Sequence, residues 1–370
     1  MNDQVATPRA FLHISLPKTG TTYLQSTLWG HTEVWREHGL LLPGNHRRHL
    51  LASLDVREVP GLANRPGNTE HPWQDLLDEC RGWRGDILIT HEFFASASPA
   101  QVQRMTHDLA GYDVHVVVTA RSVANLFPSR WQEWVKNGGR RPIDAYPPRE
   151  DYRPQDNWGW GSFDLADVLS RWSEVVDPSR IHVIAVDPAD DPGLLWERFA
   201  SVVGVGGAEI EQIDESVNTT LGVVEVELLR RINRHLTDFR SPGDRGRWIR
   251  GHLGEGDWMP RNRAPFKVGP EKRAELEARS DRAVAMLSDG GFDLIGSLEA
   301  LQPRDHSSRR HPDHVRDGEM LDSSTRLVAA MLSEIRRLTE ENDELRRAVS
   351  GPGDTEQESA GSLLDRLRRK

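Results

Sequence analysis

Lysine, threonine and glycine gather where an apolar run near the start of the chain breaks. The run Phe11 to Leu16 ends at Pro17, and Lys18-Thr19-Gly20-Thr21-Thr22 then opens an amphipathic segment with Leu24 and Leu28 on one face. Glycine lets main-chain N–H groups approach an anion, a helix N-terminus adds its dipole, and the hydroxyl and ammonium groups donate further hydrogen bonds. The segment therefore predicts a cradle for an oxyanion.

A second group of side chains that suits an anion follows another strand-like run. Arg121 comes just after the apolar run 114–118, and Ser129 stands eight residues beyond it. A guanidinium offers a planar pair of donors to a phosphate, and a hydroxyl can add a third hydrogen bond. Spacing alone leaves open that Arg121 caps the end of a strand and that Ser129 caps a helix.

Two groups that could accept a proton, His91 and Glu92, end the strand-like run 86–90. Neighbouring residues in an extended segment point to opposite faces, so we expect only one of them to face a reacting group. We favour Glu92 slightly over His91 as the base. The alternative is that both cap the helical turn that begins with Phe93.

These two anion sites, in this order and each after a strand, resemble the motifs of the sulfotransferases that use 3′-phosphoadenosine 5′-phosphosulfate (PAPS), over roughly residues 10–235. The resemblance implies that Lys18, Thr19, Gly20, Thr21 and Thr22 bind the 5′-phosphosulfate and that Lys18 also acts in catalysis. It further implies that Arg121 and Ser129 bind the 3′-phosphate, that His91 or Glu92 deprotonates the acceptor, and that no metal is required.

The acceptor pocket and the rest of the nucleotide clamp are less well defined. Trp131, Trp134, Trp158 and Trp160 could stack an acceptor ring or sugar, although core packing is the commoner use of tryptophan. The later half of the chain has no Arg-Lys-Gly element like the one that completes the clamp in the cytosolic branch of the family. Lys267 is the substitute that we consider.

The pattern of apolar runs predicts a three-layer α/β/α fold with a parallel sheet, of the type found in P-loop NTPases. Strand-like runs at 11–16, 86–90, 114–118 and 181–186 alternate with segments of helical period. Near-continuous apolar strands are typical of parallel sheets covered on both faces. Because ligands bind beyond the carboxyl ends of such strands, both anion sites and the base should share one edge of the sheet.

We expect residues 1–300 to form one sulfotransferase-like α/β domain, 301–319 a polar linker, 320–350 a coiled-coil helix and 351–370 a disordered tail. Apolar residues of the coiled-coil segment recur by three and four, at Val328, Met331, Ile335, Leu338, Leu345 and Val349.

An asparagine, Asn342, occupies an a position of this heptad register, and Glu341 and Arg346 stand at g and e. Buried asparagine at a favours a parallel two-stranded pair, and Glu341 can then meet Arg346 of the partner helix. The segment thus predicts a homodimer through residues 320–350. The alternative is a single amphipathic helix that docks on its own domain.

The length, net charge and cysteine content of the chain limit the kinds of partner and the compartment that we expect. The chain has 370 residues and a formal net charge of −10, which argues against a nucleic-acid surface and favours a small-molecule, saccharide or lipid acceptor. Its single cysteine, Cys80, excludes an intramolecular disulfide, and strand-like sequence from about residue 11 leaves no room for a secretory signal. No apolar run approaches the roughly 20 residues of a membrane span, so we expect a cytoplasmic protein without a transmembrane segment.

The sequence therefore predicts an enzyme that moves a sulfuryl group from PAPS to a hydroxyl or amine by in-line displacement. One alternative is a P-loop kinase, but that class needs Gly-x-x-x-x-Gly-Lys-Ser/Thr, and here the lysine precedes the only glycine of the loop. The other is a non-catalytic nucleotide-binding scaffold that acts through its coiled coil.

Overall fold

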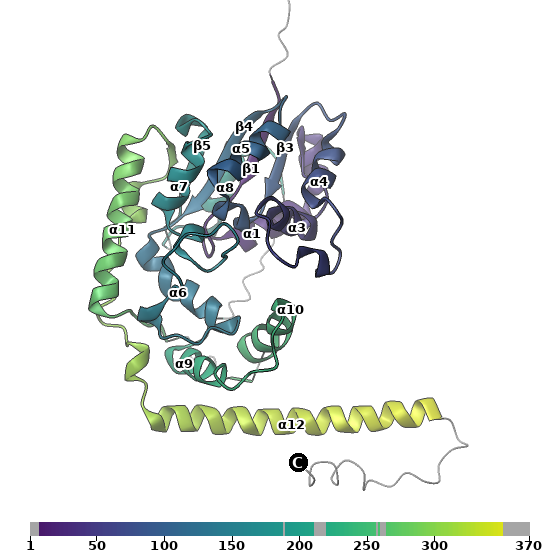
Figure 1. The fold of residues 1–370 in the computed structure, drawn as a ribbon, viewed down its shortest axis with the longest axis vertical. Helices are drawn as coiled ribbons and strands as arrows, with labels where there is room; N and C mark the ends of the chain where they lie inside the picture. Colours follow the sequence, from purple (N-terminus) through teal and green to yellow (C-terminus); the bar gives the residue numbers. More distant parts are fainter. Residues whose placement is uncertain (1–6, 188, 211–219, 257, 260–263, 351–370) are drawn as a thin grey trace, which may run out of the picture.

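The computed structural model describes residues 7–187, 189–210, 220–256, 258–259 and 264–350 (Figure 1). Within these ranges, parallel strands form one sheet of six in the order β2-β3-β1-β4-β5-β6. The strands are β1 Arg9–His13, β2 Leu40–Leu41, β3 Asp86–Thr90, β4 Asp113–Ala120, β5 Ile181–Ala185 and β6 Asp293–Ile295. The four predicted strands are present, and the short edge strands β2 and β6 are additional.

Helices connect and cover the strands. The α-helices are α1 Thr21–Gly30, α2 Thr32–Glu37, α3 His46–Val56, α4 Pro72–Cys80, α5 Pro99–Asp108, α6 Val123–Lys136, α7 Leu165–Ser173, α8 Pro192–Val203, α9 Val223–Ile232, α10 Pro242–Asp244, α11 Pro270–Asp289 and α12 Asp317–Ser350. A π-helix, η6, spans Arg245–Gly254. Short 3₁₀ helices are η1 Leu62–Asn64, η2 Glu92–Ser96, η3 Ile143–Ala145, η4 Trp160–Ser162, η5 Pro178–Arg180, η7 Leu298–Leu301 and η8 Pro312–His314.

Two apolar cores lie on the two faces of the sheet, because successive strand residues point to opposite sides. In β1, Phe11 belongs to a core with side chains of α1, α2 and α8, among them Leu24 and Trp196. Its neighbours Ala10 and Leu12 belong to a larger core that includes residues of α3 to α7, α9 and α11. This arrangement confirms the three-layer α/β/α fold (Figure 1).

A chain of buried polar side chains joins the carboxyl ends of β1, β3 and β4. His13 Nδ1 lies 2.7 Å from Thr90 Oγ1, and the other ring nitrogen of His13 contacts the Ser15 hydroxyl. The Thr119 hydroxyl donates to Ser15 Oγ over 2.8 Å and lies 2.6 Å from the hydroxyl of Thr19. Burial lowers the pKa of His13 to about 3, so its ring is neutral near pH 7.

Residues 301–319, expected as a polar linker, pack on the domain instead. The main-chain N–H of Lys267 donates to the Arg310 carbonyl over 3.1 Å, and Phe266 and Arg310 form a parallel β-bridge. The main-chain N–H of Arg304 donates to Asn125 Oδ1 of α6, also over 3.1 Å. This polar segment has too little apolar surface to fold alone, and contacts with other parts of the domain hold it in place. The expected tail, 351–370, lies outside the described residues.

Helix α12 continues for 34 residues from Asp317 to Ser350. Its first turns contact α9, and the rest runs past the domain as the long yellow-green helix of Figure 1. None of the helices that the structure describes is long and apolar enough to cross a membrane.

Replacing Thr119 with valine should lower the free energy of unfolding by about 1–3 kcal/mol, because the buried Ser15 and Thr19 hydroxyls lose a partner while the volume hardly changes. Urea unfolding followed by circular dichroism measures this loss. The exposed Thr69→Val serves as the matched control and should change stability little. Equal effects of the two substitutions would show that the polar chain contributes nothing to stability.

Candidate functional site

The residues of the predicted cradle lie at the N-terminus of α1. Lys18 and Gly20 have positive φ values of 65° and 90°, and a Cβ at Gly20 would collide with the side chain of Leu195. Helices α5 and α7 begin with side-chain caps, Ser98 and Asp164, but among the described residues no side chain caps α1. Helix α1 therefore presents its first-turn N–H groups and the positive end of its dipole to an anion.

The threonines of the cradle have different surroundings. The Thr19 hydroxyl donates to the Leu16 carbonyl over 2.6 Å, and the residue is 1% exposed. Thr21 is buried as well, whereas Thr22 is exposed. Thr19 therefore holds the loop on the sheet, and Thr22 offers a hydroxyl to a ligand.

Lys18 lies in a cluster of ionic side chains from three elements. Its Nζ is 2.8 Å from Glu133 Oε2 of α6, and Arg250 Nε of η6 is 3.1 Å from Glu133 Oε1. Burial alone would raise the pKa of Glu133, but the charges of Lys18 and Arg250 outweigh it and lower the pKa to about 2. This contact of Glu133 was not predicted from the sequence, although Glu133 comes one helical turn after Ser129 and so shares its face of α6.

The second predicted anion site lies beside the first. Arg121 Nη1 is 3.4 Å from the Lys18 carbonyl and Nη2 is 3.3 Å from the Asn125 carbonyl, both as donors. Ser129 lies partly exposed on α6, one turn beyond Asn125. The structure thus brings the tips of β1 and β4 together, as the sheet topology requires.

Two further arginines that the sequence analysis missed complete a cationic group around Arg121. Burial lowers the pKa of the Arg121 guanidinium, and the charges of Arg304 and Arg309 lower it further, against the opposing effect of Asp187. Asp187 also pairs with Arg304. Arg121 Nε is buried without a hydrogen-bond partner among the described residues. A positive group with an unpaired donor is suited to an anion such as phosphate.

The loop that carries these arginines is docked on α6. The main-chain N–H of Arg304 and the ring Nε2 of His306 both contact Asn125 Oδ1, each at 3.1 Å. The signal in the sequence was the run of basic residues from Arg304 to Arg310, which we interpreted as a linker.

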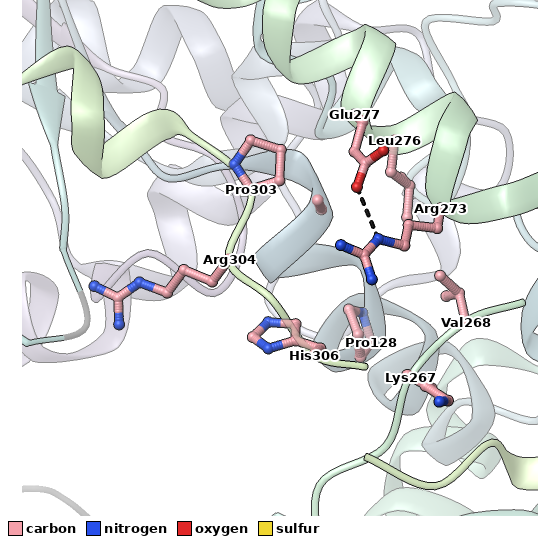
Figure 2. Close-up of a pocket in the computed structure, with 10 residues that line it drawn as sticks. Pro128, Lys267, Val268, Arg273, Leu276, Glu277, Pro303, Arg304 and His306 are labelled. Atoms are coloured by element: carbon pink, nitrogen blue, oxygen red, sulfur yellow. Dashed lines mark hydrogen bonds and ion pairs between the residues drawn. The ribbon is translucent and has the colours of Figure 1, made fainter. Parts of the chain in front are cut away.

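Lys267, our proposed clamp residue, lines the same cavity as Arg304. Pro128, Val268 and Arg273 also line it, and the Nζ of Lys267 donates to the Ser307 carbonyl. Figure 2 shows Lys267 and Arg304 at opposite ends of the residues that line this cavity. Lys267 therefore supports the loop that carries Arg304 and Arg309.

The two candidate bases have distinct environments. His91 Nδ1 accepts a hydrogen bond from the Phe93 main-chain N–H over 3.1 Å, so His91 caps η2 as the alternative interpretation expected. Burial lowers the pKa of His91 to about 4, which leaves the ring neutral at pH 7 with one nitrogen occupied. Glu92 is only partly exposed, and burial would raise its pKa, but nearby His91 and Arg130 lower it. Glu92 is thus a carboxylate at pH 7.

Two buried arginines fix the segment that carries Glu92. Arg57, just after α3, donates to the Phe93 carbonyl over 3.0 Å, and Arg171 of α7 donates to the Ala95 carbonyl over 2.9 Å. Burial lowers the pKa of Arg57 to about 10, so it stays charged. Charged donors aimed at main-chain carbonyls hold η2 in one position.

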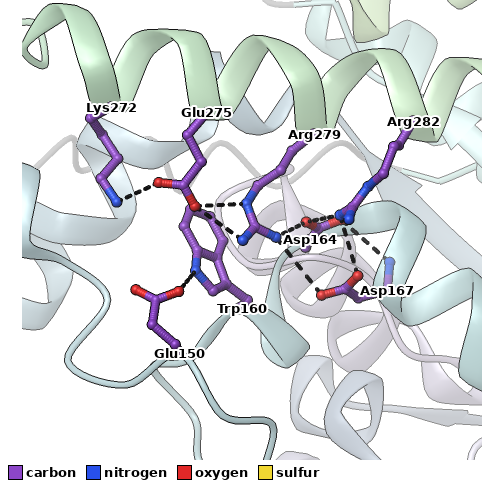
Figure 3. Close-up of polar contacts among 8 residues, drawn as sticks. All are labelled: Glu150, Trp160, Asp164, Asp167, Lys272, Glu275, Arg279 and Arg282. Carbon is purple, nitrogen blue, oxygen red and sulfur yellow. Dashed lines mark hydrogen bonds and ion pairs between the residues drawn. The ribbon is translucent and has the colours of Figure 1, made fainter.

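Three of the four candidate acceptor tryptophans are packed against the core. Trp131 is fully buried, and Trp134 packs against the ring of Tyr146. Trp160 is 4% exposed, and the guanidinium carbon of Arg279 lies 3.7 Å from its ring centroid. Figure 3 shows Arg279 and Arg282 of α11 reaching Asp164, which clamps α11 on α7 above Trp160. These aromatic residues are therefore structural.

Trp158 remains a candidate for the acceptor pocket. It is partly buried, and the guanidinium carbon of Arg130 lies 4.4 Å from its ring centroid. Arg130 is also among the charges that lower the pKa of Glu92, so Trp158, Arg130 and Glu92 belong to one region.

Comparisons with known proteins find a similarity to a solved structure. No family model matches the sequence, and no curated protein matches it. Among solved structures, the chain is similar to the crystal structure of a sulfotransferase from Alicyclobacillus acidocaldarius, with 18% sequence identity and a TM-score of 0.40. The alignment covers 77% of this chain and 97% of that chain.

Replacing Glu133 with glutamine should tighten the binding of adenosine 3′,5′-bisphosphate about five- to tenfold, because the phosphate no longer competes with a carboxylate for Lys18. Isothermal titration calorimetry measures the affinity. Because the pKa of Glu133 is about 2, the difference should persist unchanged from about pH 5 upward.

Glu255→Gln is the matched control, since Glu255 contacts Arg250 at 3.0 Å and Lys136 at 3.9 Å, and its effect should be smaller. Weaker binding by the Glu133 variant would contradict competition and would mean that Glu133 orients Lys18 for the ligand.

Proposed function

We propose that this protein is a sulfotransferase that transfers a sulfuryl group from PAPS to a hydroxyl or amine. The observation that supports it best is the adjacency of two cationic sites, the α1 N-terminus with Lys18 and the group of Arg121, Arg304 and Arg309. A nucleotide with phosphates on both its 3′ and 5′ oxygens needs two such sites within one nucleoside's length.

The residues present suit the two ends of this donor. Thr22 and the α1 amides, with the open turn at Gly20, would hold the 5′-phosphate, and Lys18 would meet charge on its oxygens. Arg121, whose Nε is buried without a partner among the described residues, would bind the 3′-phosphate together with Ser129, Arg304 and Arg309. PAPS supplies the activated sulfuryl group, and no metal is needed for this assignment.

Glu92 is the base in this proposal. It takes the proton from the acceptor hydroxyl, whose oxygen then bonds to sulfur while the bond from sulfur to the 5′-phosphate oxygen breaks. Lys18 and the α1 amides stabilise the negative charge that remains on the phosphate. His91 is neutral and has Nδ1 engaged with Phe93, so it positions Glu92 by capping η2.

The acceptor is a small molecule, a saccharide or a lipid. Trp158 offers a ring face, and Arg130 offers a charge beside it, at the side of Glu92. Incubating labelled PAPS with an extract from the native source, followed by mass spectrometry of sulfated products, would identify the acceptor.

Binding of two nucleotides tests the two phosphate sites separately. Lys18→Ala should lower the binding affinity for both adenosine 5′-phosphate and adenosine 3′,5′-bisphosphate by about 10- to 100-fold, which is what the loss of a hydrogen bond to a charged group costs. Arg121→Ala and Arg309→Ala should lower the affinity for the bisphosphate only. Calorimetry measures the affinity of each variant for each nucleotide.

Arg310 is the matched control for these arginines because it pairs with Glu319 at 2.6 Å, and Arg310→Ala should bind both nucleotides normally. The proposal fails if the wild-type protein does not bind adenosine 3′,5′-bisphosphate, or if Arg121→Ala weakens both nucleotides equally.

Substitutions at the two candidate bases test the chemistry. Glu92→Gln should lower the rate of sulfuryl transfer by about 10²–10⁴-fold while nucleotide affinity stays unchanged, because only proton removal is lost. His91→Asn should keep most activity, since asparagine can also cap η2. The rate is measured as transfer of labelled sulfate to the identified acceptor. Full activity of Glu92→Gln together with loss in His91→Asn would assign the base to His91.

A further inference from the structure

Helix α12 carries an apolar stripe that its own domain does not cover. The side chains of this stripe are between 41% and 87% exposed, and all but Leu332, at e, stand at a or d positions of the heptad: Leu321, Val328, Met331, Leu332, Ile335, Leu338, Leu345 and Val349. Single exposed apolar residues are ordinary on a surface, but a continuous row over one helix marks an interaction site.

The domain contacts a different side of the same helix. Met320, Ser323 and Leu327 are 4–7% exposed, and α12 meets α9 there. On a helical wheel these positions, g and c of the heptad, lie on one side of the seam, and although g borders the seam, the a and d side chains from Val328 onward stay exposed. Within the described residues, the structure thus excludes the alternative that the stripe docks on its own domain.

The geometry points to a second copy of this chain as the occupant, in a parallel two-stranded coiled coil along a and d. Asn342 is exposed at an a position of the stripe. In a parallel pair it faces the Asn342 of the partner and the two amides can bond to each other, whereas in an antiparallel pair it would face an apolar d residue. The asparagine therefore favours one orientation and two strands.

Charge complementarity along the seam supports the same orientation. In a parallel pair Glu341 at g meets Arg346 at e of the partner, an attractive contact. In an antiparallel pair g positions meet each other, which would bring Glu334 of one helix toward Glu341 of the next.

The outward face of α12 does not suit the other common occupant of an apolar helix face, an anionic membrane surface. It carries both signs of charge in pairs, such as Arg336–Glu340 at 2.8 Å and Arg337–Glu334 at 2.5 Å. Interfacial helices are instead enriched in lysine and arginine on their polar face.

Light scattering on size-separated full-length protein tests the pairing. The wild-type chain should have twice the monomer mass, and Leu338→Glu, which places a charge at d, should shift it to the monomer. Ser333→Glu adds the same charge at an f position and should remain a dimer. A monomeric wild type, or a Leu338→Glu variant that pairs as well as Ser333→Glu, would overturn the proposal.

Cross-linking tests the orientation. The chain has one cysteine, Cys80, which is buried, so a cysteine added on α12 reports on its own. Val349→Cys lies at an a position near the end of the helix and should form a disulfide between copies under mild oxidation, because parallel helices bring the two ends together. Arg347→Cys, on the outer face, should cross-link far less. A dimer in which Val349→Cys fails to cross-link would overturn the parallel arrangement.

A charge exchange tests the register. Glu341→Arg should weaken the dimer, and adding Arg346→Glu should restore it. The contact of Glu341 with Arg337 within one chain, at 3.0 Å, is lost in both variants, so recovery in the double variant reports on the partner helix. Equal dimer affinities of the single and double variants would contradict this register.

Discussion

The buried hydrogen-bond chain from Thr90 through His13 and Ser15 to Thr119 and Thr19 is the constraint on which the site depends. Each of these residues stands next to the loop it supports, so the candidate base, the candidate cradle and the arginine site share one framework at the strand ends. Buried polar groups are costly unless all are satisfied, and each hydroxyl here can be satisfied only when the three strand ends have their present spacing. The network therefore fixes a distance that apolar packing alone would leave less well defined.

On this framework the molecule, although acidic overall, concentrates cations at one edge of its sheet. Like charges placed so close would repel and destabilise the fold, and carboxylates offset them: Glu133 beside Lys18 and Arg250, and Asp187 beside Arg304. Each acidic residue comes from an element other than that of the cation it neutralises. The positive site is therefore assembled by tertiary structure and stabilised without a bound anion.

The layers of the fold, four of the strands and the placement of Lys18 beside Arg121 could be predicted from local sequence. The spacing of apolar residues and the point where a strand ends both depend only on neighbouring residues in the chain. Local sequence could not predict β2 and β6, whose few residues leave no pattern, nor the order of residues 301–319, whose partners are Asn125 and Phe266 far back in the chain. Arg304 and Arg309 were missed for the same reason. For Trp160 the sequence left acceptor stacking and core packing both open, because only the tertiary structure shows Arg279 stacked on its ring.

Lys18 and Arg304 each have a carboxylate as partner, so an incoming phosphate would exchange partners with Glu133 and Asp187 rather than meet bare charges. The attraction that the phosphate gains is offset by the ion pair that it breaks, so the net binding free energy is much smaller than either interaction alone. Under the proposed function, such an exchange would help the enzyme to release a doubly phosphorylated nucleotide after each turnover. The same carboxylates that keep the folded site stable would then favour departure of the product, because Glu133 can return to Lys18 as the phosphate leaves.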